Sequence, residues 1–439
     1  MLINLEKNIT MKTKSLLIIL SFFSIISLIF LSCGNRDKRI ERVAQNQPID
    51  TAGTGIKEPN SKLISEVTFL IENSGSMLGY VNKANNFKDA IITLSLFPEL
   101  DHSKKEFYFI NGKKISLNLI GTDPEFLKNN LNQISFTKYG DTRYSNLTRM
   151  FEEALSFAKD NEISILISDC IYDVGEEQDP LTALKIETEK TKKVFRDRLT
   201  NENIQTVIIK AESQFEGKYF FASQKGYQKI NQIRPYYIMI FGNSELLNKN
   251  FTEENISKKI AGYVSSARFM KINNVRIPYQ ATNEKSKGTF KFDPVDKNKL
   301  INVKKDRNSN EFQFSIAVDY SSLPFSDTYY KTIKNYELKN TYKIIDIYTP
   351  NKLIYGVPFH ISHLITLNTT SSPYGIIELT LKYIIPTWIT ETNSNNELKI
   401  IGDSTHTFGF KNLTDAITEA YQYKNQQQNI ATFKLEILK

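Results

Sequence analysis

The sequence is poor in the residues that build zinc centres and disulfide frameworks. Only two cysteines, Cys33 and Cys170, and four histidines occur among its 439 residues. Because Cys33 has a separate role near the N-terminus, we expect no intrachain disulfide. His360 and His363 form the one close histidine pair. A three-residue step along a strand would point them to opposite faces, which disfavours shared metal ligation. We therefore do not expect a zinc enzyme.

Blocks of positive charge are also missing, although the net charge is +8 at neutral pH. The excess of lysine and arginine is spread along the chain, whereas nucleic-acid surfaces show a clustered basic stripe. We therefore predict no nucleic-acid partner. The composition is otherwise that of a globular protein, with 40% hydrophobic and 24% charged residues. The length allows two or three domains.

The N-terminus has the pattern of a secretory leader. Lys12 and Lys14 precede an apolar run over residues 15–32, as in a signal peptide. The run ends at Leu31-Ser32-Cys33-Gly34, which resembles a bacterial lipobox. That resemblance implies cleavage after Ser32 and a lipid on Cys33. A retained transmembrane anchor is the alternative, because the run is almost long enough to span a bilayer core of ~30 Å.

Residues 1–32 are accordingly predicted to be a signal peptide. Residues 33–62, which are polar and aperiodic, are predicted to be a lipidated cysteine with a flexible tether. Asp50-Thr51-Ala52 resembles the O-glycosylation acceptor of Bacteroidota envelope proteins. The residues after Cys33 lack the acidic run that resembles surface-export signals in that group. We expect a lipid-anchored protein of a bacterial cell envelope, at the outer membrane and facing the periplasm.

Two short apolar runs each end at a carboxylate. The run over residues 67–71 stops at Glu72, and the run over residues 163–168 stops at Asp169. Such runs are typical of strands buried on both faces of a parallel α/β sheet. Ligand sites in these sheets lie beyond the carboxyl ends of the strands. Carboxylates there, with the hydroxyls that follow Glu72, are oxygen ligands suited to a hard divalent cation.

A third polar stretch, Gly140-Asp141-Thr142, lies between these two runs and opens a helix. Apolar residues recur at three- and four-residue steps over residues 147–158, which predicts an amphipathic helix. Ser145 is the expected N-cap of that helix. Cys170 follows Asp169 directly and is expected to be a small buried packing residue.

Together these three stretches resemble the motifs of von Willebrand factor A-type domains. Glu72-Asn73-Ser74-Gly75-Ser76-Met77 is similar to the first motif, Asp-x-Ser-x-Ser, with a longer acid. Thr142 matches the threonine of the second motif, and Asp169 matches the aspartate of the third. The resemblance implies a mostly parallel, Rossmann-like sheet with flanking helices over residues 63–265. It also implies a metal-ion-dependent adhesion site for Mg²⁺, or Mn²⁺ or Ca²⁺, with the ligands Glu72, Ser74, Ser76, Thr142 and Asp169.

The remaining elements of this domain follow from local patterns. Asn111-Gly112 marks a tight hairpin, and Asp179-Pro180 starts a long charged helix. The other predicted elements are helices at 87–96, 124–134 and 244–263, and strands at 205–209 and 235–241 with an exposed excursion over 212–234. From residue 266 to 439, short alternating strands with turn signals predict a β-rich, sandwich-like domain. One helix is expected there, near Leu413–Tyr423.

Three interpretations of function follow. The first is an envelope lipoprotein, not an enzyme, that binds a protein partner whose carboxylate completes the coordination of the cation. The second is a metal-assisted hydrolase with Ser74 or Ser76 as nucleophile, although no base-plus-nucleophile pair is visible in the sequence. The third is a structural lipoprotein with a degenerate, metal-free domain. If Glu72 reached the metal directly, it would close the open position and make the site structural.

Overall fold

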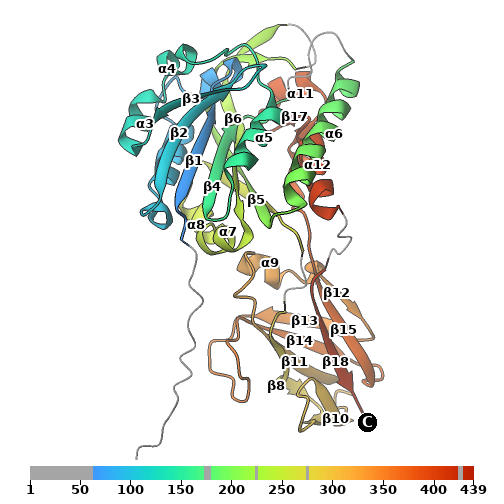
Figure 1. The fold of residues 1–439 in the computed structure, drawn as a ribbon. Helices are drawn as coiled ribbons and strands as arrows, with labels where there is room; N and C mark the ends of the chain where they lie inside the picture. The colour runs from blue at the N-terminus through green and yellow to red at the C-terminus, as the bar shows by residue number, and fades with distance from the viewer. Residues whose placement is uncertain (1–62, 173–178, 223–225, 273–275, 424–428) are drawn as a thin grey trace, which may run out of the picture. The chain divides into compact units, whose positions relative to one another are not determined.

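The computed structural model describes residues 63–172, 179–222, 226–272, 276–423 and 429–439 (Figure 1). The predicted signal peptide, the lipidated Cys33 and the tether lie outside these residues and stay predictions. Within the described ranges, no helix combines the length and the apolar character that crossing a bilayer requires.

The α/β part is built on one seven-stranded sheet with the order β3-β2-β1-β4-β6-β5-β7. Its strands are β1 (Glu66–Glu72), β2 (Lys104–Asn111), β3 (Ser116–Gly121), β4 (Glu162–Ser168), β5 (Ile204–Phe220), β6 (Tyr227–Asn243) and β7 (Tyr263–Phe269). Its helices are η1 (Gly75–Tyr80), α2 (Asn86–Ser95), η2 (Pro98–Leu100), α3 (Pro124–Asn130), α4 (Gln133–Lys138), α5 (Leu147–Phe157), α6 (Pro180–Leu199), α7 (Ser244–Asn250) and α8 (Glu253–Lys259).

The predicted α/β class is confirmed, but the sheet is mixed. Strand β1 is parallel to both β2 and β4. The neighbours β2–β3, β4–β6, β5–β6 and β5–β7 are antiparallel. The difference from a mostly parallel sheet arises because residues 212–220 and 227–234 continue β5 and β6 as a pair of antiparallel strands and form no crossover helix.

The hairpin extends past the sheet. Each of its strands has 17 residues, whereas the pairing of β6 with β4 ends at Tyr237 and the pairing of β5 with β7 ends at Ala211. Residues 212–220 and 227–235 therefore pair only with each other within the sheet. We call this paired extension the arm. It replaces the exposed, irregular excursion that the sequence predicted.

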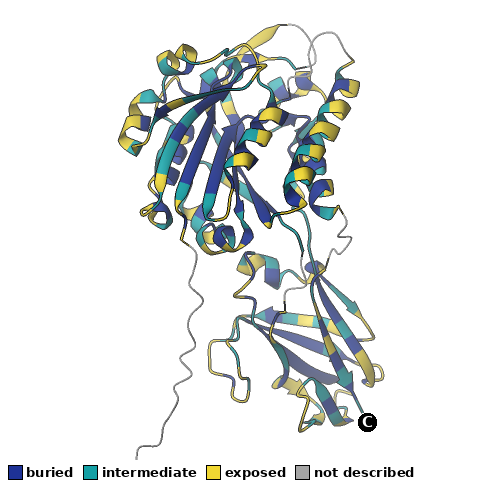
Figure 2. Cartoon of the chain, viewed as in Figure 1, coloured by how far each residue is buried: buried dark blue, intermediate teal, exposed yellow. Residues whose placement is uncertain are grey.

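Helices cover both faces of the sheet. Successive residues of a strand point to opposite faces, and the neighbours Tyr236 and Tyr237 on β6 have different partners. Tyr236 contacts Phe87 of α2, with ring centroids 5.0 Å apart, while Tyr237 stacks on Phe410 at 4.2 Å. The strands between these layers are buried along most of their length (Figure 2). Burial on both faces explains why β1 and β4 are continuous apolar runs.

The predicted helix over residues 244–263 is instead two short helices and a strand. Helix α7 ends at Asn250, and the Thr252 side chain then accepts a hydrogen bond from the Asn255 amide and caps α8. Strand β7 follows and pairs with β5. A threonine cap at this position starts a new helix, because its side chain replaces the missing intrahelical partner of an N-terminal amide.

Antiparallel sheets dominate the C-terminal region, as the sequence predicts. One sheet has the order β12-β15-β18-β10-β9 and the other β13-β14-β11-β8. The strands of the first are β9 (Thr289–Phe292), β10 (Lys299–Lys304), β12 (Tyr336–Lys339), β15 (Gly375–Lys382) and β18 (Asn429–Ile437), and those of the second are β8 (Tyr279–Lys287), β11 (Phe312–Val318), β13 (Lys343–Tyr348) and β14 (His363–Thr369). Phe314 of β11 and Phe433 of β18 belong to one hydrophobic cluster, so the two sheets share a core. Two short helices, α9 (Asp327–Lys331) and η3 (Ile333–Asn335), precede β12.

One segment of this C-terminal region packs with the α/β core instead. It holds α10 (Trp388–Glu391), β16 (Asn393–Ser394), α11 (Glu397–Gly402), β17 (Thr407–Phe408) and α12 (Phe410–Gln422). The predicted helix near 413–423 is therefore present as α12, but its buried face, including Leu413 and Ile417, joins the cluster around the seven-stranded sheet. Lys210 of β5 donates a hydrogen bond to Thr392 at 2.9 Å and ties the segment to the sheet. The amphipathic pattern of α12 predicted which of its faces is buried. It did not predict which hydrophobic core that face joins.

Candidate metal centre

Two carboxylates meet where β1 and β4 end. In the parallel pairing of these strands, Ile71 lies beside Ile167, so Glu72 is level with Ser168 and one residue short of Asp169. Glu72 is 1% exposed and Asp169 is 4% exposed. The sequence prediction that the two acids share one sheet edge is therefore met. The edge is not open to solvent at either carboxylate.

Both oxygens of Glu72 accept hydrogen bonds from serine hydroxyls. Ser145 donates to Oε1 at 2.7 Å and Ser168 donates to Oε2 at 2.5 Å. The Ser168 oxygen in turn accepts from the Cys170 amide at 2.8 Å. Burial, and next the charge of Asp169, raise the pKa of Glu72 to about 7, while these hydroxyls act in the opposite direction. A carboxylate that is buried beside a second carboxylate favours its protonated form.

The two serines of the first motif link the acids. The hydroxyl oxygens of Ser74 and Ser76 lie 3.0 Å apart. Ser74 lowers the pKa of Glu72, and Ser76 lowers that of Asp169. Burial is the larger influence on Asp169, and the net result is a raised pKa. The four side chains form one cluster of oxygen atoms, with Ser76 more exposed than the others.

Thr142 lies against the same cluster through its main chain. Its carbonyl oxygen accepts a hydrogen bond from the Gly75 amide at 2.7 Å, which joins the second motif to the first. The neighbouring Asp141 forms an ion pair with Arg143, with Nε to Oδ1 at 2.9 Å. All five residues predicted as metal ligands are thus brought to one edge of the sheet. For Thr142 the contact that fixes its place is made by the carbonyl oxygen.

A network of buried asparagine side chains connects the residue after Glu72 with the segment that leads to Gly140. Asn111 donates to the side-chain oxygen of Asn73 at 2.9 Å and to the carbonyl of Tyr139 at 2.9 Å. Asn73 donates to the carbonyls of Phe136 and Tyr139. The network holds the turn at Gly140 next to the residue that follows Glu72. The sequence predicted Asn111 only as part of the hairpin between β2 and β3, where it pairs with Ser116. It did not predict this network, because hydrogen bonds between distant segments leave no local pattern.

The expected cap at Ser145 is wrong by one residue. Helix α5 begins at Leu147, and the Asn146 side chain accepts from the Arg149 amide at 3.1 Å. Ser145 is thereby free to donate to Glu72.

Cys170 is fully buried with φ at +57°, and burial raises the pKa of its thiol well above the usual range. This agrees with a packing residue and not with a reactive thiolate.

The arm covers the segment that carries the two serines. Gly79 of η1 and Gly217 of the arm touch so closely that a Cβ on Gly217 would lie 2.8 Å from the Gly79 Cα. The Tyr80 hydroxyl donates to the carbonyl of Pro235 at 2.6 Å. The Phe220 ring lies 3.2 Å from the position that a Cβ on Gly75 would take. The arm therefore packs on η1 and on the turn that carries the two serines.

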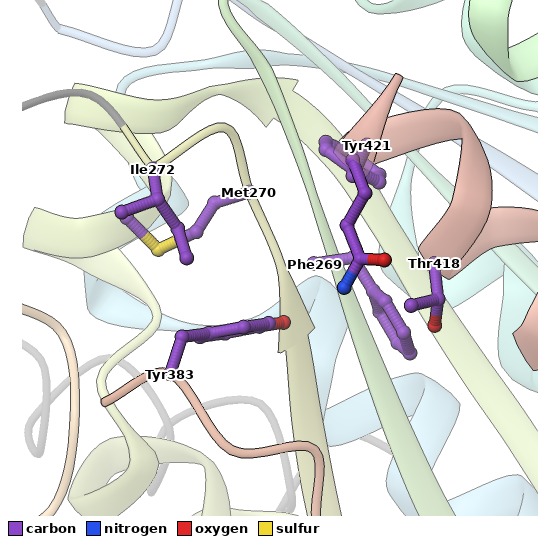
Figure 3. Close-up of a pocket in the computed structure, with 7 residues that line it drawn as sticks. Phe269, Met270, Ile272, Tyr383, Thr418 and Tyr421 are labelled. Atoms are coloured by element: carbon purple, nitrogen blue, oxygen red, sulfur yellow. The ribbon is translucent and has the colours of Figure 1, made fainter. Parts of the chain in front are cut away.

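Other metal-binding or ligand-binding arrangements are weak. Within the described ranges, no group of three or more His, Cys, Asp or Glu residues could hold a metal. His360 and His363 have separate partners, Ser321 and Asp327, at 3.1 Å each. A cavity of about 10 Å³, large enough for about one water, is lined by Phe269, Met270, Ile272, Tyr383, Thr418, Tyr421 and Gln422 (Figure 3). It shares no residue with the candidate centre.

Comparison with known proteins adds no relative. No protein-family model matches the chain, and no curated protein matches it in sequence. The function is therefore inferred from the geometry of the site.

Proposed function

We propose that this chain is a cell-envelope lipoprotein with a von Willebrand A-like domain that binds a protein partner through a divalent cation. The observation that most supports the proposal is the cluster of Glu72, Ser74, Ser76 and Asp169 at the ends of two parallel strands. Three segments far apart in the sequence converge there. The lipid on Cys33, the outer-membrane location and the periplasmic orientation belong to the same proposal.

The donor atoms of the cluster fit a hard cation. They are carboxylate and hydroxyl oxygens, which Mg²⁺, Mn²⁺ and Ca²⁺ prefer. Ser74, Ser76 and Thr142 would supply neutral oxygens, and Glu72 and Asp169 would supply charge. When bound, the cation supplies a positive charge at this edge, and a carboxylate of the partner can complete its coordination. The buried carboxylate pair gives the chain a reason to bind a cation. Burial raises the pKa of both acids, the charge of Asp169 raises that of Glu72 further, and a bound cation would favour the ionised form of each.

Cation binding is expected to stabilise the full chain against heat. A ligand that binds only the folded state adds about 2.7 kcal/mol at a concentration about 100 times its Kd. Titration with MgCl₂ or MnCl₂ should therefore raise the melting temperature of the wild type. Asp169→Asn should remove most of this effect. Asp141→Asn is the matched control, because Asp141 is an exposed acid next to Thr142 that pairs with Arg143, and it should respond like the wild type.

A second measurement separates a binding site from a closed, structural one. The relaxation rate of solvent water protons rises when bound Mn²⁺ keeps an exchangeable water ligand. We expect this increase with the wild type, and we expect a simple carboxylate such as acetate to reduce it. Stabilisation by Mn²⁺ without any relaxation increase would mean that Glu72 closes the coordination sphere, and it would contradict the partner-binding role.

A structural, metal-free domain is the second candidate function. Two observations favour it: both oxygens of Glu72 are already hydrogen-bonded, and the arm contacts η1 closely. An absence of any melting-temperature change with Mg²⁺ and Mn²⁺ would select this alternative. The hydrolase interpretation gains no support, because in the described part of the chain neither Ser74 nor Ser76 has a histidine as hydrogen-bond partner.

A further inference from the structure

Arg234, on the arm, is a buried charge with no ion-pair partner among the described residues. It is 2% exposed. Among the residues that the structure describes, no carboxylate lies within ion-pair distance of it, and its Nη1 atom has no hydrogen-bond partner. A buried charge costs several kcal/mol unless something compensates it. A guanidinium in this position therefore needs an explanation.

The register of the sheet places Arg234 beside the candidate centre. Tyr237 pairs with Ser168, so Arg234, three residues earlier on the antiparallel strand, lies past the end of β4 on the Asp169 side. The rings of Tyr219 and Phe215 flank the guanidinium, with centroids 4.5 and 5.8 Å from its central carbon. Cation–π contacts of this kind hold a guanidinium in a fixed orientation.

The charge of Arg234 acts on the groups of the centre. It lowers the pKa of Asp169, against the burial that raises it. It also lowers the pKa of the Tyr80 hydroxyl, and Tyr80 ends the short helix η1, which follows Ser74 and contains Ser76. The arm therefore brings a positive charge to a cluster that otherwise contains two carboxylates and several hydroxyls.

We infer that Arg234 is a positioning residue of the candidate centre, a fixed counter-charge that stabilises the Asp169 carboxylate from beyond ion-pair distance when no metal is bound and that opposes the binding of a cation. The second half of this inference rests on the proposed function. A divalent cation added to two carboxylates and one guanidinium leaves one excess positive charge. That excess favours an anionic ligand, such as a partner's carboxylate, at the open coordination position over a neutral one.

The first test needs no metal. A double-mutant cycle combines Arg234→Met with Asp169→Asn in the full chain, with urea unfolding measured in EDTA. Methionine keeps an unbranched apolar side chain beside the Tyr219 ring but removes the guanidinium and its charge. We expect the two changes to be non-additive, by about tenfold in the unfolding equilibrium constant. Additive effects would overturn the inference. Arg234→Gln replaces Arg234→Met if the methionine variant does not fold.

The second test measures the affinity for Mn²⁺ by electron paramagnetic resonance. Arg234→Met should bind Mn²⁺ about tenfold more tightly than the wild type, because a like charge has been removed. Arg234→Lys, which keeps the charge, should bind like the wild type. Arg268→Met is the matched control: Arg268 is 6% exposed and its Nη1 also has no partner, but it lies on β7. Its loss should leave Mn²⁺ affinity within about twofold.

The two tests separate the possible failures. Equal or weaker Mn²⁺ binding by Arg234→Met, while the wild type does bind Mn²⁺, would overturn the role of Arg234 toward the cation. If the wild type bound no Mn²⁺ at all, the proposed function would fail. The mutant cycle alone would then decide whether Arg234 stabilises the Asp169 carboxylate. A merely structural arginine would lower the stability of the fold without tightening Mn²⁺ binding.

Discussion

Metal-free protein is expected to become about 3 kcal/mol less stable as the pH rises from 4.5 to 8, because of Glu72 alone. Burial and the neighbouring Asp169 raise the pKa of Glu72 from 4.5 to about 7. Between these values the folded state binds more protons at this group than the unfolded state, so its stability falls as pH rises. Each unit of the pKa difference corresponds to about 1.36 kcal/mol, and the loss is complete above about pH 8.

The difference between wild type and Glu72→Gln isolates this contribution. Glutamine has nearly the same shape and carries no charge, so its stability should not share the decline. Urea unfolding in EDTA should give similar free energies for both proteins near pH 4. The variant should be the more stable one at pH 8. Saturating MgCl₂ should restore the wild type at pH 8 and leave the variant unchanged. A difference that stays constant across this pH range would show that Glu72 ionises normally in the folded state.

Replacing Gly140 by alanine is expected to destabilise the protein by about 3 kcal/mol. Gly140 has φ at +71°, and an added Cβ would lie 2.0 Å from the Asn111 side-chain oxygen. Asn111 would have to move and give up its buried hydrogen bonds to Asn73 and Tyr139. The loop that carries Thr142 would move with it, so cation binding should weaken together with stability. Urea unfolding measures the first effect and Mn²⁺ affinity the second.

Gly356→Ala is the control for backbone strain alone. Gly356 has φ at +83°, and nothing lies within 4 Å of an added Cβ. Its replacement should lower the free energy of unfolding by about 1 kcal/mol, because alanine is disfavoured in the left-handed conformation. The Mn²⁺ affinity should stay unchanged. Equal destabilisation by the two substitutions would mean that the Asn73–Asn111 network contributes nothing to the fold.

Local patterns identified the carboxylates of the site but not their environment. The runs before Glu72 and Asp169 are apolar because β1 and β4 are buried on both faces, and a strand of that kind is recognisable from a few consecutive residues. The polar residue after each run marks the sheet edge. Neighbouring parallel strands end at the same edge, and the prediction that β1 and β4 are neighbours came from the resemblance to von Willebrand A-type motifs.

The path of β5 and β6 could not be predicted in the same way. Residues 212–234 carry polar and aromatic side chains without a clear alternation, and we expected an exposed excursion. The described residues among them, 212–220 and 227–234, belong to the arm, which packs on η1. Pairing between two strands depends on a partner that the local pattern does not contain. The segment with α12 poses the same difficulty, since an apolar stripe does not specify which core it joins.

The sequence by itself determined that this chain contains an α/β sheet with two acids and two serines at its edge and an antiparallel β-rich region after it. Only the tertiary structure decided that Ser145 and Ser168 donate hydrogen bonds to Glu72, that the arm packs on the turn with Ser74 and Ser76, and that Arg234 brings a positive charge near the site. The physical reason is range. The periodic burial of a strand can be read from adjacent residues. The hydrogen bonds of Glu72 instead join it to serines that are 73 and 96 residues away in the sequence. These contacts form only when the whole sheet is assembled.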